Sequence, residues 1–329
     1  MHDAMPPLPV THSVLAPNGI AALIDARYDL TPVRSCTLLR SYANEVYAVR
    51  TRDGQGFVFK LFRREWQNTA AVGWEADLQR HLIACGCPVS EPVALRDGGV
   101  VIEIPAPEGT RAGLLLRELA GDKPDRPFTD DLYFRHGASL ATMHAAMDSM
   151  PTLGAGGERI YDADTLIDRP LDAIRRACGT SASTAVKAAR IAHELRDELE
   201  RAPSAADWGI CHGDATMDNI HVLPDGRHAF FDFDLAGSCW RALDLCAIHQ
   251  WARRDPAARS YWPAFLAGYR SRRHVGEADI ALLPAVAAAW ELWDIAHELE
   301  NWARWSGSWR MTPAMLDERI ARLSSWNAL

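Results

Sequence analysis

The sequence has 329 residues and a mass of 36.4 kDa, enough for about two domains with a large core. Its 48% hydrophobic and 24% charged residues exclude a disordered chain or a coiled coil, and its net charge of −8 argues against nucleic acid and anionic membranes as partners. Scattered cysteines that fit neither a disulfide framework nor a zinc site, and the lack of a long uncharged apolar run, predict a soluble cytoplasmic protein.

The first third of the chain predicts a small antiparallel sheet that carries one helix. Residues 1–34 read as a lead-in with a short helix, and residues 35–120 as the sheet lobe. Alternating apolar residues flank Asp53-Gly54, which is a strong hairpin signal. The expected elements are a helix at 17–28, strands at 46–51 and 56–62, a helix at 68–84, and strands at 92–95, 100–104 and 113–119.

The rest of the chain, residues 121–329, predicts a larger and mostly helical lobe that follows a linker at 120–125. Helices are expected at 131–147 and 285–305. A short hairpin, with strands at 220–223 and 228–232, interrupts the helical pattern around a Pro-Asp-Gly turn. The predicted fold class is therefore α+β, with a small antiparallel β-sheet lobe and a larger helical lobe.

The acidic and amide side chains around this hairpin are the strongest chemical signal in the sequence. Asp214 stands five residues before Asn219, and Asp232 follows at the far end of the hairpin. Phosphoryl transfer needs a carboxylate that accepts the substrate's hydroxyl proton and oxygen ligands that hold magnesium against the nucleotide phosphates. We assign these roles to Asp214, and to Asn219 and Asp232, respectively. The alternative is a polar turn that serves only turn chemistry.

A lysine inside an apolar strand gives a second signal. Lys60 lies in the run Phe-Val-Phe-Lys-Leu-Phe at residues 57–62, and Glu75 follows on the predicted helix. A strand lysine paired with a helix glutamate positions the α and β phosphates in kinases. The alternative is a lysine on an exposed strand edge.

These segments resemble a known superfamily. The residues His-Gly-Asp at 212–214 with Asn219, and Phe-Asp-Phe-Asp at 231–234, are similar to the signature of the aminoglycoside phosphotransferases and choline kinase-like proteins, relatives of the protein kinases. Residues 41–47 and 57–60 further resemble the stress response kinase A branch, which is near homoserine kinase of the second type. The resemblance implies a bilobal protein-kinase-like fold that binds ATP and Mg²⁺ in the cleft between its lobes.

The same resemblance implies roles for further residues. The backbone of Glu118, Leu119 and Ala120 would contact adenine. The turn at 41–45 would cover the phosphates, with contacts from the Ser41 hydroxyl and from the backbone up to Asn44, alongside the clamp formed by Lys60 and Glu75. Unlike its counterpart in protein kinases, this turn contains no glycine.

Several neighbouring residues are expected to be structural. By analogy, Asp244 holds the loop at 212–219 through hydrogen bonds. Asp234 stands where protein kinases have glycine; it is either an additional metal ligand or, as we prefer, a charge satisfied by the backbone and a residue such as Arg241. His144 and His212 are expected to be packed and hydrogen-bonded.

Tryptophan is concentrated near the end of the chain, and this bears on the phosphate acceptor. In the helix predicted at 285–305, an aromatic and acidic face is formed by Trp290, Trp293, Asp294, His297 and Asn301. Aromatic rings beside carboxylates suit a cationic or sugar-like acceptor. The alternative is that these rings fill a helical core.

Three functions follow from these observations. The first is an ATP- and Mg²⁺-dependent kinase that phosphorylates a hydroxyl of a small molecule, such as an amino alcohol, a sugar or an aminoglycoside. The second is a protein serine/threonine kinase of the bacterial stress-response type, with a protein substrate. The third is a pseudokinase that binds nucleotide without turnover, against which the intact Lys60, Asp214, Asn219 and Asp232 argue.

Overall fold

Two compact units make up the chain. The computed structural model describes residues 8–151, 156–180, 182–248 and 256–328, so the first seven residues of the predicted lead-in lie outside the described part. The sheet unit contains the chain up to Arg80 together with Ser90–Glu118 and a short piece at Gly157. The helical unit contains His81–Val89, Leu119–Thr152 and Glu158–Leu329.

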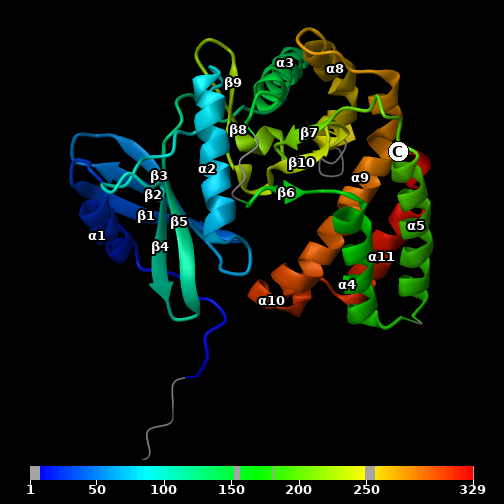
Figure 1. Cartoon of the computed structure of the whole chain (residues 1–329), viewed down its shortest axis with the longest axis horizontal. Coiled ribbons are helices and arrows are strands. Elements are labelled where there is room, and N and C mark those ends of the chain that lie inside the picture. Colours follow the sequence, from blue (N-terminus) through cyan, green and yellow to red (C-terminus); the bar gives the residue numbers. More distant parts are fainter. Residues whose placement is uncertain (1–7, 152–155, 181, 249–255, 329) are drawn as a thin grey trace, which may run out of the picture. The chain divides into compact units, whose positions relative to one another are not determined.

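A five-stranded antiparallel sheet forms the body of the sheet unit (Figure 1). Its strand order is β1-β2-β3-β5-β4. The hairpin predicted at Asp53-Gly54 joins β2 to β3, and Gly54 there adopts a positive φ of 87°. The strands are β1 (Val33–Ser41), β2 (Asn44–Thr51), β3 (Gly56–Phe62), β4 (Val101–Ala106) and β5 (Gly109–Arg117).

The predicted set of strands is wrong at two places. β1 was not expected, because its polar residues hide a strand that has only half-buried and exposed positions. Residues 92–95, in turn, form only isolated bridges, from Pro92 to Leu116 and from Leu95 to Tyr28. The N–H groups of Val93 and Leu95 donate to the carbonyls of Leu115 and Gly99, so this segment bonds to different segments instead of along one partner strand.

Two helices cover opposite faces of this sheet. Ile20 and Ile24 of α1 (Pro17–Arg27) pack with Phe59 and its neighbours on one face. On the other face, α2 (Thr69–Ala84) packs with Phe62 and Leu114. Since side chains alternate along a strand, residue 60 lies on the same face as Phe62, the face that α2 covers.

A buried arginine on β5 links the start of β2, just after the turn that follows β1, to the end of β3. Arg111 on β5 is 1% exposed, and one of its Nη atoms lies 2.8 Å from Glu45 Oε1. Its guanidinium also donates hydrogen bonds to the carbonyls of Leu61 and Phe62 on β3. Glu45 is fully buried and accepts a hydrogen bond from the Tyr47 hydroxyl. The strand that carries Lys60 is therefore braced from β5.

Arg111→Met should destabilise the protein by about 3–5 kcal/mol, because it leaves the Glu45 carboxylate buried without its cation. The free energy of unfolding in urea measures this change. Arg117→Met is a matched control on the same strand, since that arginine is 48% exposed and pairs with Glu91. Its loss should stay below about 1 kcal/mol. Equal losses for the two variants would contradict the role given to Arg111.

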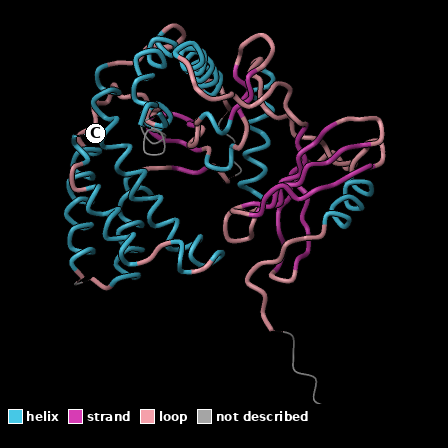
Figure 2. The backbone as a smooth tube through the Cα atoms, turned by 180° about the vertical axis from the view of Figure 1, so that it is seen from behind, coloured by secondary structure: helices cyan, strands magenta, loops and turns pink. Residues whose placement is uncertain are grey.

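Helices dominate the helical unit, as the cyan segments of Figure 2 show. The predicted helix at 131–147 is α3, and the predicted helix at 285–305 begins earlier, as part of α9. Three-residue helical turns at Met217–Asn219 and Phe233–Leu235 also lie here. The α-helices are α3 (Asp130–Met147), α4 (Arg169–Cys178), α5 (Ser183–Glu200), α6 (Ala242–Leu245), α8 (Trp262–Arg270), α9 (Glu277–His297), α10 (Ala303–Ser306) and α11 (Pro313–Leu323).

Two small sheets complete this unit. The predicted hairpin forms with β8 (Ile220–Val222) paired to β9 (His228–Phe230). A second sheet has the order β6-β10-β7. Its strands are β6 (Arg159–Ile160), β7 (Trp208–Cys211) and β10 (Gly237–Trp240).

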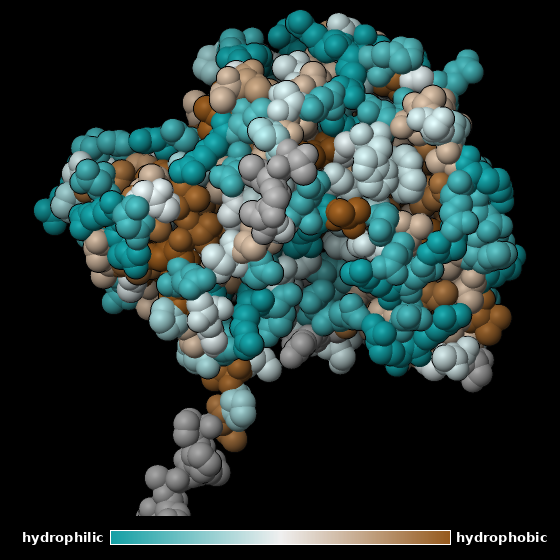
Figure 3. Space-filling view, viewed as in Figure 1, coloured by the Kyte–Doolittle hydropathy of each residue, from teal (hydrophilic) through white to brown (hydrophobic). Residues whose placement is uncertain are grey.

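The helix α9 is the central apolar helix of this unit. The stretch Glu277–Asn301 is 25 residues long with a mean hydropathy of 1.2, so by length and composition alone it could cross a membrane. However, 72% of that apolar window is buried inside the protein, where α9 packs against α4, α5 and α6. A helix with so few charged residues is expected in such a core position. Hydrophilic side chains cover much of the face seen in Figure 3.

Candidate active site

The loop at residues 212–219 follows β7 and turns sharply at its second residue. Gly213 adopts a φ of 82°, and a Cβ atom there would lie 2.2 Å from the carbonyl oxygen of Leu235. Only glycine fits this turn, because a side chain would be both strained and blocked. The turn brings the loop against the segment that carries Asp232.

Asp214 and Asn219 lie together at the two ends of this turn. Nδ2 of Asn219 donates hydrogen bonds to Oδ2 of Asp214 at 2.6 Å and to its carbonyl oxygen at 3.0 Å. Asn219 is 6% exposed, whereas Asp214 is half-buried. The amide therefore fixes the carboxylate and keeps its own Oδ1 as an acceptor. Both interpretations of this segment fit these bonds, because Asn side chains in polar turns also bond back to the preceding loop residues.

Asp244 on α6 holds the start of the loop, as the sequence predicts. Its carboxylate accepts hydrogen bonds from the backbone N–H of His212 at 2.6 Å and of Gly213 at 2.8 Å. It also accepts one from Nε2 of His144 at 2.9 Å. Burial alone would raise the pKa of Asp244, but the hydrogen bonds from His144 and His212 hold it below its ordinary value. The anchor is thus an ionised carboxylate.

Asp232 has a backbone conformation that is rare for its residue type. Its φ of 70° and ψ of 60° are left-handed. Within the described ranges, it is the only residue other than glycine with a positive φ. Residues other than glycine seldom adopt this conformation; aspartate is one of those that do, and such positions cluster at functional sites. The preceding residue, Phe231, donates its N–H to the carbonyl of Asn219 at 3.1 Å. This backbone hydrogen bond brings Asp232, the next residue, close to Asn219.

Lys60 and Glu75 form a buried ion pair in the sheet unit. Nζ of Lys60 lies 3.4 Å from Oε1 of Glu75, with the side chains 4% and 2% exposed. The ammonium also lies over the ring of Phe62, 4.9 Å from its centroid. Because β3 is flanked by β2 and β5, the interpretation of Lys60 as an exposed edge residue is wrong. Its contact with phosphate stays a prediction.

The predicted phosphate-covering turn is a tight connection between β1 and β2. Ser41 ends β1 and pairs with Glu45, and Asn44 begins β2. The N–H of Tyr42 donates to the carbonyl of Asn44 at 2.9 Å, which closes the turn without a glycine. Ser41 is half-buried and Asn44 is 5% exposed.

The residues predicted to contact adenine lie where one unit ends and the other begins. Glu118 closes the sheet unit, while the half-buried Leu119 and the exposed Ala120 open the helical unit. The N–H of Glu118 donates to the carbonyl of Gly56 at 3.0 Å, and its carboxylate pairs with Arg50 at 2.7 Å. The Glu118 side chain is thus engaged by the sheet.

Arg241 does not serve as the partner of Asp234, and that expectation is wrong. Nη2 of Arg241 donates to Asp148 at 2.6 Å, and its other guanidinium nitrogens find no acceptor in the described chain. Arg273 joins the same carboxylate and also pairs with Asp207. The sequence does not reveal this cluster, because its members lie far apart along the chain.

The aromatic face of α9 forms a stack. The rings of Trp290 and Trp293 lie 4.5 Å apart at 24°, and those of Trp293 and His297 lie 5.2 Å apart at 3°. Tyr161 packs edge-on against both tryptophans and donates its hydroxyl proton to the carbonyl of Leu235. Asp294 pairs with Arg319 at 2.6 Å. These contacts agree with the packing interpretation of this face.

His136 is a residue of the site that sequence reasoning missed. Its Nε2 donates to the carbonyl of Ala215 at 2.9 Å, so it braces the loop beside Asp214. It lies eight residues before His144 on α3, about two helical turns away and therefore on the same face. Two histidines at that spacing on an apolar face could have signalled a shared partner.

The comparisons with known proteins agree with this geometry. The model of the phosphotransferase enzyme family matches residues 35–283, so the chain belongs to that family. An uncharacterised protein of Deinococcus radiodurans is 32% identical over 87% of this chain and 82% of its own length. A homoserine kinase of Azorhizobium caulinodans is 27% identical, and the match covers 84% of each chain. The predicted family and an ATP-dependent phosphotransferase activity are thereby confirmed.

Solved kinase structures share the fold. An amicoumacin kinase in complex with AMP-PNP, Ca²⁺ and Ami has a TM-score of 0.76 at 18% identity, covering 94% of this chain and 93% of its own. A microcompartment-associated aminopropanol kinase has a TM-score of 0.74 at 23% identity, covering 95% and 96%. The predicted α+β, protein-kinase-like fold class is confirmed by these neighbours.

His144→Gln should flatten the dependence of stability on pH. Burial, and then Arg241, lower the pKa of His144 from 6.5 to about 4, so the unfolded chain binds its proton first as the pH falls. The contribution of the neutral His144 ring to the stability of the folded protein is complete above pH 6.5 and is lost as the pH falls to about 4. Urea unfolding at several pH values in this window gives the slope of the unfolding free energy against pH. That slope reports the protons taken up on unfolding, and it should be about one proton lower in the variant. His193→Gln, at a residue whose side chain is 76% exposed, is the control and should leave the slope unchanged.

Proposed function

We propose that this protein transfers the γ-phosphate of ATP to a hydroxyl group of a small-molecule acceptor, with Asp214 as the catalytic base. The observation that carries the proposal is the hydrogen bond from the Asn219 amide to the Asp214 carboxylate, at 2.6 Å. The backbone of Asn219 also bonds to Phe231, the residue before Asp232 with its left-handed conformation. Membership of the phosphotransferase enzyme family supports it.

The Asp214 carboxylate would accept the proton of the acceptor hydroxyl. As the hydroxyl oxygen forms its bond to the γ-phosphorus, the bond from that phosphorus to the β–γ bridging oxygen breaks and ADP leaves. Asn219 donates a hydrogen bond to one carboxylate oxygen of Asp214 and so orients the carboxylate that would receive the proton. Asp244 and His136 hold the backbone on either side of this base.

Asn219 and Asp232 fit a magnesium site. Magnesium prefers oxygen ligands, takes one or two carboxylates from the protein and completes its coordination with phosphates and water. Oδ1 of Asn219 and the carboxylate of Asp232 supply such oxygens. Among the described residues, no group of three His, Cys, Asp or Glu could hold a metal on its own. Bound magnesium would offset the negative charge of the phosphate oxygens.

The residues of the sheet unit would bind the rest of the nucleotide. Lys60, oriented by Glu75, would pair with the α and β phosphates, as a strand lysine does in kinases. The Ser41 hydroxyl and the turn before Asn44 would add phosphate contacts. The carbonyl of Glu118 and the backbone of Leu119 and Ala120 would meet adenine, since the N–H of Glu118 is already bound to Gly56.

We propose an alcohol that also carries an amine as the acceptor class. The kinases named for homoserine and for aminopropanol support this class, because both compounds combine a hydroxyl with an amine. After Asp232, one helical turn at Phe233–Leu235 leads into β10, which pairs with β6 and β7. This leaves no long segment before α6 to bind a peptide. We propose the cytoplasm as the location of the reaction, because ATP would be its donor.

Asp214→Asn should lower the turnover of phosphate transfer about 10²–10⁴-fold and leave ATP binding unchanged, because it removes the proton acceptor but keeps the shape. The measurement is transfer of γ-labelled phosphate to homoserine, aminopropanol, aminoglycosides and a generic protein, offered in turn. Asp218→Asn is the matched control, since Asp218 is exposed on the same loop. Label that reaches only protein would contradict the acceptor class, and an active Asp214→Asn variant would contradict the base.

Asp232→Gly and Asp232→Ala should both weaken the binding of ATP in the presence of magnesium, because both lose the carboxylate. They should differ in stability, since alanine at φ 70° is strained by about 1 kcal/mol relative to glycine. Calorimetric titration with and without magnesium, together with urea unfolding, checks both expectations. Unchanged ATP affinity in the two variants would transfer the metal role to Asp234.

A further inference from the structure

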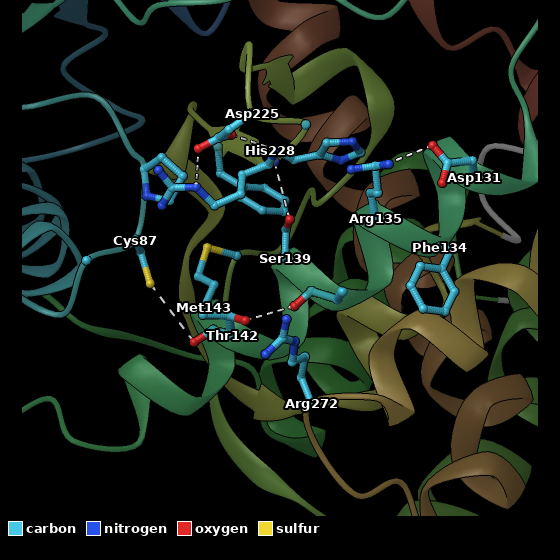
Figure 4. A pocket seen from close by; sticks show the side chains of 16 residues that line it. Cys87, Asp131, Phe134, Arg135, Ser139, Thr142, Met143, Asp225, His228 and Arg272 are labelled. Atoms are coloured by element: carbon cyan, nitrogen blue, oxygen red, sulfur yellow. Dashed lines mark hydrogen bonds and ion pairs between the residues drawn. The ribbon is translucent and has the colours of Figure 1, made fainter.

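A cavity in the helical unit lies apart from the residues assigned above. It has a volume of about 350 Å³ and lies between α3, the β8–β9 hairpin and the chain at residues 86–88 (Figure 4). Cavities of roughly 300–1,000 Å³ are typical of small-molecule sites. Neither the 212–219 loop nor Asp232 lines it.

The walls of this cavity are mainly apolar, and its charges are almost balanced. Ion pairs join Arg135 to Asp131 at 2.7 Å and Arg227 to Asp225 at 2.8 Å. Arg272 also lines the cavity, and its guanidinium makes no hydrogen bond or ion pair with any described residue. The apolar lining consists of Pro88, Phe134, Ala138, Met143 and Phe230. One uncompensated cation beside apolar walls fits an amphipathic molecule with one negative charge.

Two buried histidines connect this cavity to the 212–219 loop. His228 lines the cavity, and its Nδ1 lies 3.3 Å from Nδ1 of His136. Because Nε2 of His136 donates to the carbonyl of Ala215, its Nδ1 accepts and the Nδ1 of His228 carries the proton. Nε2 of His228 is then an acceptor, and it is buried without a hydrogen-bond partner in the described chain.

The chemistry of the two rings supports this assignment. Burial lowers the pKa of His136 to about 4 and that of His228 to about 3, so both rings are neutral near neutral pH. An unpartnered acceptor of this kind is costly in a protein interior. Since His228 is 0% exposed and its Nε2 has no accessible surface, the cavity reaches this residue but not that nitrogen.

We propose that this cavity binds a small amphipathic anion. Its apolar body packs against Phe134 and Met143, and its negative group pairs with Arg272. Occupancy is transmitted through His136 to the carbonyl of Ala215, the neighbour of Asp214. This last step rests on the function proposed above, whereas binding itself does not.

The binding test uses two fluorescent probes with the same aromatic amine body. Anilinonaphthalene sulfonate carries the negative charge and N-phenylnaphthylamine does not. Arg272→Gln should weaken the sulfonate probe about fivefold and leave the neutral probe unchanged. Arg270→Gln, an exposed arginine two positions away that does not line the cavity, should change neither. Equal effects of the two substitutions on the sulfonate probe would overturn the charge assignment.

Filling the cavity tests its location. Ala138→Trp should abolish saturable binding of both probes, and the smaller Ala138→Leu should weaken both; the latter provides the same measurement if the tryptophan variant does not fold. Circular dichroism confirms the fold of each variant. Unchanged binding in a folded Ala138 variant would overturn the site.

Phosphate transfer tests the connection to the loop. The sulfonate probe should change the turnover of the wild type by roughly fivefold, the low end of typical coupling, but not that of His228→Phe, which still binds it. Unchanged wild-type turnover, with the probe bound, would overturn the coupling. If no protein transfers phosphate, the proposed function fails instead, and ring-nitrogen NMR signals then decide: a shift at His136 on probe binding supports the coupling, and no shift overturns it.

Discussion

The geometry of the candidate active site depends on the hydrogen bonds that the buried Asp244 carboxylate accepts. A charge in a protein interior costs several kcal/mol unless hydrogen bonds satisfy it. Here the donors are the N–H groups of His212 and Gly213 together with the ring of His144. Two of the three donors belong to the loop itself, so the charge is satisfied only when the loop has this shape. The stability of the helical unit and the position of Asp214 are thereby linked.

The helix α3 provides the rigid support for this arrangement. His144 orients the Asp244 carboxylate, while the Tyr269 hydroxyl binds the other ring nitrogen of His144 at 2.7 Å. Two turns earlier on the same helix, the ring of His136 is also fixed, because its two nitrogens bond to Ala215 and His228. One helix face thus supports the loop on both sides of Asp214, through Asp244 and through Ala215. Such support from regular structure positions a reacting group more closely than a loop alone.

Local patterns predicted much of this structure, and long-range pairs account for what they missed. The strand lysine followed by a helix glutamate predicted the pair of Lys60 and Glu75, and the motif around Asp214 located the loop. In contrast, β1 has no buried alternation to reveal it. The pairing of Arg241 with Asp148 depends on how separate helices pack, which no short segment encodes. The same holds for Arg111, whose partner Glu45 lies on another strand.

His212 shows why a residue expected only to be packed can control the spacing of a site. Its Nε2 donates to the carbonyl of Phe231 and its ring packs 4.5 Å from that of Phe233, so it holds both neighbours of Asp232. Its Nδ1 accepts the N–H of Asp214 at 3.3 Å. Burial lowers the pKa of His212, and only the neutral ring can donate on one side and accept on the other. Phenylalanine has the shape but neither bond, so histidine is the residue that can hold Asp214 and the two neighbours of Asp232 at once.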